Sequence, residues 1–251
     1  MNLNQQQTAY LSDTYNRMEQ KFRAECHRMN GRIPYISIDG AYPTWDESMI
    51  NWWTNGFWGG IMWQLYHAEN NSDYMSEASC LEEHLEKAFE HFDLLDHDVG
   101  FLWLHTAVAH YRLTGDPTAR QRGLRAAAVL ASRYCPAGEY IRAWNRPGLS
   151  QMIIDCVMNL PLLFWAASEG AGDHYRQIAI HHLDRVLTHI IREDGSCNHI
   201  VEFDEATGEV LNIPGGQGYG ENSSWSRGQS WAIYGLALAY RYTKKTSYLN
   251  A

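Results

Sequence analysis

The stretch Ser223–Leu236 (SSWSRGQSWAIYGL) places an arginine, a glutamine and two tryptophans at the beginning of a predicted helix. Arg227 offers a planar pair of donors that suits a carboxylate, and Gln229 can both donate and accept hydrogen bonds. Trp225 and Trp231 supply flat apolar faces against which a sugar ring can pack. These residues could therefore form a site for an anionic sugar. The alternative is an ordinary helix start with buried aromatic side chains, and this stretch alone favours neither.

Two aspartates have the chemistry for acid and base catalysis. Asp155 lies in the apolar stretch Met152–Leu160 (MIIDCVMNL), and burial of that helix face would favour the protonated carboxyl that a general acid needs near neutral pH. The alternative is a buried aspartate that is hydrogen-bonded to the backbone or to an asparagine. Asp98, in the sequence HDVGF, directly precedes a predicted helix, and its position alone favours an N-cap.

Helical periodicity runs through most of the chain. Apolar positions recur at helical spacing in segments of ordinary helix length, which short polar or Gly/Pro-rich connections separate. We therefore predict an all-α chain with helices near residues 5–29, 56–70, 73–91, 100–114, 117–133, 150–168, 173–191 and 227–242. Turn signals such as Gly115-Asp116-Pro117 fall between consecutive helices and indicate helical hairpins.

The pattern changes to alternation between residues 197 and 211, which predicts a small β-hairpin around a turn at 205–208. A glycine-rich loop follows at 214–220, and it lacks the GK[ST] sequence of a phosphate-binding loop. The helical hairpins suit either a toroid or a solenoid. Ten tryptophans and fifteen tyrosines favour the toroid, because an open aromatic groove can hold sugars.

Composition limits the class of protein. With 251 residues and 45% hydrophobic content, we expect one domain over residues 1–251. A net charge of -9 argues against nucleic acid and anionic membrane surfaces as partners. The polar N-terminus and the lack of a long apolar run favour a cytoplasmic protein without a membrane span. Five scattered cysteines without a CxxC pair predict reduced thiols, and the histidines show no zinc-ligand spacing, so we expect no metal.

Three stretches resemble the signatures of glycoside hydrolase family 88, the unsaturated glucuronyl hydrolases. They are HDVGF at residues 97–101, SQMIIDCVMNLPLLFWA at 150–166 and SSWSRGQSWAIYGLA at 223–237. The resemblance implies an (α/α)6 barrel of twelve helices. It also implies an enzyme that removes a 4,5-unsaturated glucuronic acid from the non-reducing end of lyase-generated oligosaccharides. In that chemistry an acid protonates C4 of the vinyl ether and water adds at C5, with no cofactor or metal.

The resemblance also implies roles for individual residues. Asp155 matches the general acid and base of the family, and Asp98 matches a second essential aspartate that binds sugar hydroxyls and helps keep Asp155 protonated. Substrate-binding positions carry over by motif to Trp53, Phe57, His199, Gln217, Arg227 and Trp231. Arg227 would bind the uronate carboxylate. Without the resemblance, His199 would be interpreted as a capping or core histidine.

Chain length departs from the pattern of the family. Twelve helices need roughly 120 residues more than 251, so we expect a barrel that is incomplete at its C-terminal end. Its apolar faces would then be uncovered, which predicts aggregation or a homo-oligomer unless another chain completes the ring. Two other functions stay open: an unsaturated rhamnogalacturonyl hydrolase acting on pectin fragments, and a non-catalytic relative that binds sugars without turnover. The residues of the three motifs favour the glucuronyl family over the first alternative. The presence of both Asp98 and Asp155 argues against the second.

Overall fold

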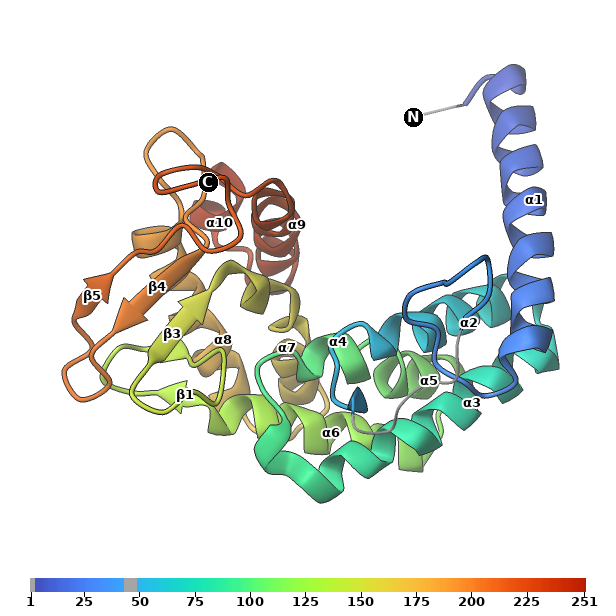
Figure 1. The fold of residues 1–251 in the computed structure, drawn as a ribbon, viewed down its shortest axis with the longest axis horizontal. Helices are drawn as coiled ribbons and strands as arrows, with labels where there is room; N and C mark the ends of the chain where they lie inside the picture. The colour runs from blue at the N-terminus through green and yellow to red at the C-terminus, as the bar shows by residue number, and fades with distance from the viewer. Residues whose placement is uncertain (1–2, 43–48) are drawn as a thin grey trace.

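The helices follow one another along an open arc in the computed structural model, which describes residues 3–42 and 49–251 (Figure 1). The first part of the arc contains α1 (Gln5–Met29), α2 (Asn55–Glu69), α3 (Ser72–Glu86), the 3-10 helix η2 (Lys87–Leu94), α4 (Val99–Trp103), α5 (Ala107–Thr114) and α6 (Pro117–Ser132). The second part contains the 3-10 helix η3 (Ile154–Met158), α7 (Pro161–Ser168), α8 (Asp173–Arg185), the π-helix η4 (Val186–Ile190), α9 (Ser226–Thr243) and α10 (Thr246–Asn250). In Figure 1, α1 stands at one end of the arc, and α9 and α10 lie at the other.

Two small antiparallel sheets interrupt the helices in the second half of the arc. One pairs β1 (Tyr134–Cys135) with β2 (Tyr140–Ile141), and the other has the order β3 (Ser150–Ile153), β4 (Ile200–Phe203) and β5 (Val210–Asn212). The hairpin predicted between residues 197 and 211 is therefore confirmed. The register pairs Ile153 with Ile200. Because the strands are antiparallel, the residues that follow β3 and precede β4 meet at the same end of the sheet.

The helix predicted over residues 150–168 is wrong over residues 150–153, and residues 154–158 form the 3-10 helix η3. Residues 150–153 form β3, all four of them buried, and they pair with β4. The apolar run fits a strand buried on both faces as well as it fits a helix, so periodicity alone does not separate the two. The helix begins only at Pro161, whose fixed φ suits the first helical turn.

Three other predicted helices are interrupted or pass from α-helix into another helix type. The helix predicted over 100–114 is broken, because Thr106 leaves helical geometry (φ −104°, ψ −92°) and its hydroxyl donates to the carbonyl of Leu102 at 2.6 Å. The helix predicted over 73–91 continues from α3 into η2, and the one over 173–191 ends in η4. The remaining predicted helices agree with α1, α2, α6 and α9 to within a few residues.

Local signals explain several helix boundaries. At the start of α1, Asn4 accepts the backbone N–H of Gln7, and the side chain of Gln7 accepts that of Asn4. At α6, Asp116 caps the first turn and is followed by Pro117. Among the described residues all five cysteines are free, as predicted, and no helix combines the length and apolar character that a membrane span needs.

A wide groove follows the concave side of the arc. It has a volume of about 1270 Å³, and α1, α2, α5 and α9 supply most of its walls. Many of the lining side chains are apolar or aromatic, including those of Tyr15, Phe22, Ile61, Leu113 and Leu238. The groove therefore has a largely apolar lining.

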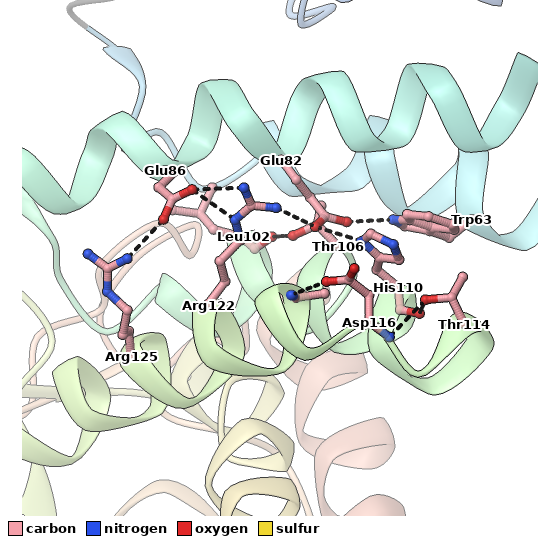
Figure 2. Close-up of polar contacts among 11 residues, drawn as sticks. Trp63, Glu82, Glu86, Leu102, Thr106, His110, Thr114, Asp116, Arg122 and Arg125 are labelled. Atoms are coloured by element: carbon pink, nitrogen blue, oxygen red, sulfur yellow. Dashed lines mark hydrogen bonds and ion pairs between the residues drawn. The ribbon is translucent and has the colours of Figure 1, made fainter.

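A buried carboxylate ties the hairpins of the first half together (Figure 2). Glu82 of α3 is 1% exposed and accepts the indole N–H of Trp63 of α2 at 2.9 Å. Its other oxygen lies 3.1 Å from Nδ1 of His110 of α5 and 3.4 Å from Nη1 of Arg122 of α6. Glu82 therefore joins four helices, and its charge is balanced inside the protein.

Replacement of Glu82 by alanine is expected to lower the free energy of unfolding by about 3–5 kcal/mol. The reason is that Trp63 and Arg122 would keep buried donors without their acceptor. Urea denaturation followed by far-ultraviolet circular dichroism measures the change. Glu83→Ala, at the exposed neighbouring position, is the control and should change stability by less than about 0.5 kcal/mol. Equal effects of the two substitutions would contradict the prediction.

Candidate active site

Asp155 and His199 meet at the end of the β3–β4 pair. Asp155 lies in η3 directly after β3, and His199 directly precedes β4. Nε2 of His199 lies 3.6 Å from Oδ2 of Asp155. Nδ1 of His199 accepts the backbone N–H of Gln217 at 2.9 Å, so in the neutral ring Nε2 carries the proton. That proton is directed toward Asp155.

Both facing atoms, Oδ2 of Asp155 and Nε2 of His199, are buried and without a hydrogen-bond partner in the part of the chain that the structure describes. Buried polar atoms are nearly always paired in native proteins, so these two unpaired atoms are candidates for contact with a ligand. The ring of Trp225 lies 4.5 Å from that of His199 and covers one side of it.

Gly216 makes room for this histidine. Its φ is +61°, a conformation that residues with a side chain rarely adopt, and a Cβ atom there would lie 2.8 Å from Cγ of His199. We expect Gly216→Ala to lower the free energy of unfolding by about 1–2 kcal/mol and to disturb the Nε2–H tautomer of His199. Denaturation and ¹⁵N NMR of the histidine ring measure the two effects. Gly220→Ala is the control, because nothing lies within 4 Å of a Cβ atom there; if the two variants behaved alike, this role of Gly216 would be excluded.

Asp98 occupies the N-cap position of α4, but its side chain makes no capping hydrogen bond. Instead, Oδ1 of Asp98 accepts the side-chain amide of Asn159 at 3.2 Å and lies 3.4 Å from Nε2 of His97. The N-cap interpretation is therefore right about the position and wrong about the side chain. The carboxyl faces η3, which carries Asp155.

Burial, and after it the nearby charge of Asp155, raises the pKa of Asp98 from 3.8 to about 7. The hydrogen bond from Asn159 and the positive charge of Arg133 act against this rise. Burial also raises the pKa of Asp96 to about 6. From the sequence we expected burial to keep a proton on Asp155. In the structure it is the pKa of Asp98 that burial raises.

An aromatic wall stands beside the two carboxyls. Trp53 lies in edge contact with Phe57 at 5.6 Å and with Trp231 at 6.1 Å between ring centroids. Phe101, which follows Asp98 in α4, fills the space between them at 5.4 Å from Trp53 and 5.8 Å from Trp231. Trp231 in turn contacts Trp225 at 5.5 Å, which continues the wall to His199.

Arg227 lies against this wall with its charge available. Its guanidinium carbon is 4.2 Å from the ring centroid of Trp225 and 5.2 Å from that of Trp231, and Nη2 donates to Oε1 of Gln217 at 3.2 Å. Within residues 3–42 and 49–251 no carboxylate pairs with Arg227. An exposed arginine held flat by aromatic rings, in a chain of charge -9, is suited to an anionic group of a ligand.

The fold thus brings all eight predicted site residues into one connected region. The predicted set consists of Trp53, Phe57, Asp98, Asp155, His199, Gln217, Arg227 and Trp231. They come from segments far apart in the sequence, and aromatic contacts and hydrogen bonds link them.

The sequence profile of Glycosyl Hydrolase Family 88 matches residues 25–249. The chain belongs to this family. The unsaturated chondroitin disaccharide hydrolase of Streptococcus pyogenes serotype M1 is 36% identical over 211 residues, which are 82% of this chain and 52% of that protein. This family 88 chain therefore spans about half the length of the curated relatives that it matches.

Solved structures confirm the fold. The crystal structure of an unsaturated glucuronyl hydrolase from Streptococcus agalactiae superposes with a TM-score of 0.84 at 31% identity, over 93% of this chain and 60% of that one. A structure of an unsaturated glucuronyl hydrolase variant with dGlcA-Glc-Rha-Glc gives a TM-score of 0.85 at 32% identity, over 91% of this chain and 62% of that one. Those proteins are (α/α)6 barrels, and the arc of this family 88 chain follows part of such a barrel.

Sequence reasoning missed two residues of the site in this family 88 chain and assigned one wrongly. Phe101 and Asn159 lie inside the recognised stretches, but nothing in their types marked them as part of the site. Gln229, proposed as a ligand group, instead donates to the carbonyl of Gly195 at 3.0 Å and accepts the hydroxyl of Ser224 at 2.9 Å. It therefore holds the loop before α9.

One cluster of this family 88 chain has the spacing of cation ligands. Ligand atoms of Asp96, His97 and Asp98 all lie within 4.8 Å of one another. Burial lowers the pKa of His97 and raises those of the two carboxyls, so it favours the neutral form of each group. A protonated carboxyl is a poor metal ligand. We therefore interpret this cluster as groups that hold or exchange protons, and not as a metal site.

Proposed function

We propose that this chain is an unsaturated glucuronyl hydrolase that releases 4,5-unsaturated glucuronic acid from the non-reducing end of glycosaminoglycan-type oligosaccharides. The observation that carries the proposal is that Asn159 links the Asp98 carboxyl to the backbone of Asp155, in a region where Arg227 lies on an aromatic wall without a carboxylate partner among the described residues. Acid and base groups, a cation and sugar-packing surfaces are the parts that the reaction needs. The names of the relatives support the same activity.

Arg227 orients the substrate in this proposal. Its guanidinium binds the carboxylate at C5 of the unsaturated sugar, and the rings of Trp225 and Trp231 pack against the sugar face. The double bond is conjugated to that carboxylate, so a fixed carboxylate places C4 and C5 at a defined distance from the acid. Positioning of this kind supplies a large part of the rate.

Asp155 then transfers the proton. It donates a proton to C4, which breaks the double bond and leaves positive charge on C5 and the ring oxygen. Water adds at C5 and gives up one proton to the Asp155 carboxylate, which regenerates the acid. The hemiketal opens and releases the rest of the oligosaccharide, so the sum of the steps is the addition of one water molecule.

Asp98 provides the second carboxyl and the charge balance. Burial of its carboxyl, together with the nearby charge of Asp155, raises the pKa of Asp98 to about 7, so ionisation of both carboxyls is disfavoured. Near pH 7 Asp98 therefore still holds a proton in a large part of the molecules. The Nε2–H of His199 and the carboxyl of Asp98 are placed to hold sugar hydroxyls or the attacking water.

A chondroitin- or hyaluronan-type disaccharide is the substrate class that we propose, because three of the curated relatives are named for chondroitin disaccharides. The sister activity on pectin fragments has no support from these names. A non-catalytic sugar-binding role is the remaining alternative. We also propose self-association through the apolar groove, which light scattering tests directly.

Loss of ultraviolet absorbance from the conjugated double bond measures the proposed reaction. The protein is mixed with unsaturated disaccharides made by chondroitin, hyaluronan and pectin lyases in parallel. Consumption of the first two, with release of the neutral sugar, is the expected result. Consumption of the pectin product alone would favour the sister activity, and calorimetric binding without consumption of any substrate would favour the non-catalytic role.

A further inference from the structure

Asn159 connects the two carboxyl-bearing segments of the site. It follows η3, is 0% exposed, and packs against the first turn of α4. Its Oδ1 accepts the backbone N–H of Phe101 at 2.7 Å. Its Nδ2 lies 3.2 Å from Oδ1 of Asp98 and 3.4 Å from the carbonyl oxygen of Asp155.

These partners determine which way the amide points. A backbone N–H can only donate, so the atom of Asn159 that faces Phe101 must be the oxygen. The amino group must then face Asp98 and the carbonyl of Asp155, and each of its two hydrogens has one acceptor. Both donors of the side chain are therefore used within the protein, and none is left for a substrate.

Gly100 allows this arrangement. A Cβ atom at Gly100 would lie 2.6 Å from Cα of Asn159, so only glycine lets α4 approach η3 so closely. The close approach puts the Asp98 carboxyl within reach of the Asn159 amide. The close backbone contact at Gly100 and the hydrogen bond from Asn159 therefore both fix the distance between α4 and η3.

Several charged and titratable groups face Asp98 from the segments around it. They are Asp96 and His97 on its own segment, Asp155 and Cys156 on η3, and Arg133 at the end of α6. Asp96 and Asp155 can carry negative charge and Arg133 carries positive charge, whereas burial raises the pKa of the Cys156 thiol and lowers that of the His97 ring. Asn159 is a neutral group that donates a hydrogen bond to Asp98 in these surroundings.

We propose that Asn159 is the positioning residue of the site: its amide holds the Asp98 carboxyl at a set spacing from Asp155 and leaves Oδ2 of Asp98 for the substrate. The catalytic part of this proposal rests on the proposed function. The structural part does not, because the hydrogen bond acts on Asp98 in the free protein. Loss of the amide would remove a donor that favours the ionised carboxyl, so the pKa of Asp98 would rise.

Two variants of Asn159 test the proposal with a matched control. Asn159→Asp keeps the size and the acceptor for Phe101, but replaces the donor with a group that repels Asp98 when ionised. Asn159→Ala removes both contacts. Asn55→Ala is the control: Asn55 is also 0% exposed and donates to the carbonyls of Met49 and Ile50, with no carboxyl among its partners.

The primary measurement is the titration of Asp98 by ¹³C NMR of aspartate carboxyls in each variant, assigned with Asp98→Asn. Both Asn159 variants should move the Asp98 midpoint upward by about one pH unit, and the control should not move it. The kcat for an unsaturated disaccharide should fall by roughly 10²-fold in both variants, with an optimum at higher pH and a smaller change in KM.

An unshifted Asp98 titration in folded Asn159→Asp would overturn the proposal. So would a change in stability alone, equal to that of Asn55→Ala, because a merely structural asparagine would give that result. If the unmodified protein turned over no substrate, the proposed function would fail, yet the titration would still decide the role of Asn159.

Discussion

Asp155→Asn is expected to reduce kcat for an unsaturated disaccharide by about 10³-fold or more. The amide keeps the shape of the carboxyl but cannot give a proton to C4 or take one from water. Oδ2 of Asp155 is buried and unpaired within the described residues, so an asparagine fits the same space and its oxygen can still face Nε2 of His199. Binding and folding should therefore change little, and the loss should fall on the chemical step.

The absorbance assay under saturating substrate measures the effect of Asp155→Asn, and circular dichroism confirms the fold. Asp173→Asn is the control, because this aspartate is 71% exposed at the start of α8. It should keep kcat within about twofold of the unmodified protein. A folded Asp155→Asn protein with unchanged kcat would rule out Asp155 as the acid.

Asp98→Asn is expected to stabilise the protein at pH 8 while it impairs turnover. The ordinary pKa of this carboxyl is 3.8, and burial raises it to about 7 in the folded protein. Below about pH 4 both the folded and the unfolded protein hold the proton, and the carboxyl costs the fold nothing. As the pH rises toward 7 the unfolded chain releases its proton first, so stability is lost progressively up to the folded pKa.

The cost of the ionised Asp98 at pH 8 is on the order of 2–4 kcal/mol, and the neutral asparagine removes it. Urea denaturation of Asp98→Asn and the unmodified protein at pH 4 and pH 8 measures the difference. The gain should be present at pH 8 and nearly absent at pH 4. Asp204→Asn is the control: backbone N–H groups of Thr207 and Ala206 lower the pKa of Asp204, so its replacement should give no gain at pH 8.

A gain for Asp98→Asn that is equal at pH 4 and pH 8 would contradict the titration argument. A loss of stability at pH 8 would show instead that the hydrogen bond from Asn159 outweighs the burial of the charge. The expected combination of higher stability and lower activity is common at sites where charged groups are kept buried for chemistry.

Much of the helical framework could be predicted because its signals are local. The reciprocal caps of Asn4 and Gln7 begin α1, and Asp116 with Pro117 begins α6, whatever the rest of the chain does. The β3 strand could not be predicted in this way. Residues 150–153 are apolar throughout, and only pairing with β4, far along the chain, decides between strand and helix.

The residues of the candidate site were predicted from their motifs, but their arrangement could not be. Short stretches of sequence carry the types of side chain that the family's chemistry needs, and they pointed to Asp98, Asp155, His199 and Arg227 without any coordinates. They could not show that Asn159 lies between the carboxyls, since that contact depends on how closely Gly100 lets two segments approach.

The sequence by itself determined the helical class, the family and the residue types that meet in the site, because each of these is written in neighbouring residues. Tertiary structure alone decided that burial raises the pKa of Asp98, and that Gln217 sets the tautomer of His199. A pKa depends on the solvent and the charges that folding excludes or brings near, and a tautomer depends on which donor folding places beside the ring. Neither can be obtained from the order of residues before their distances are known.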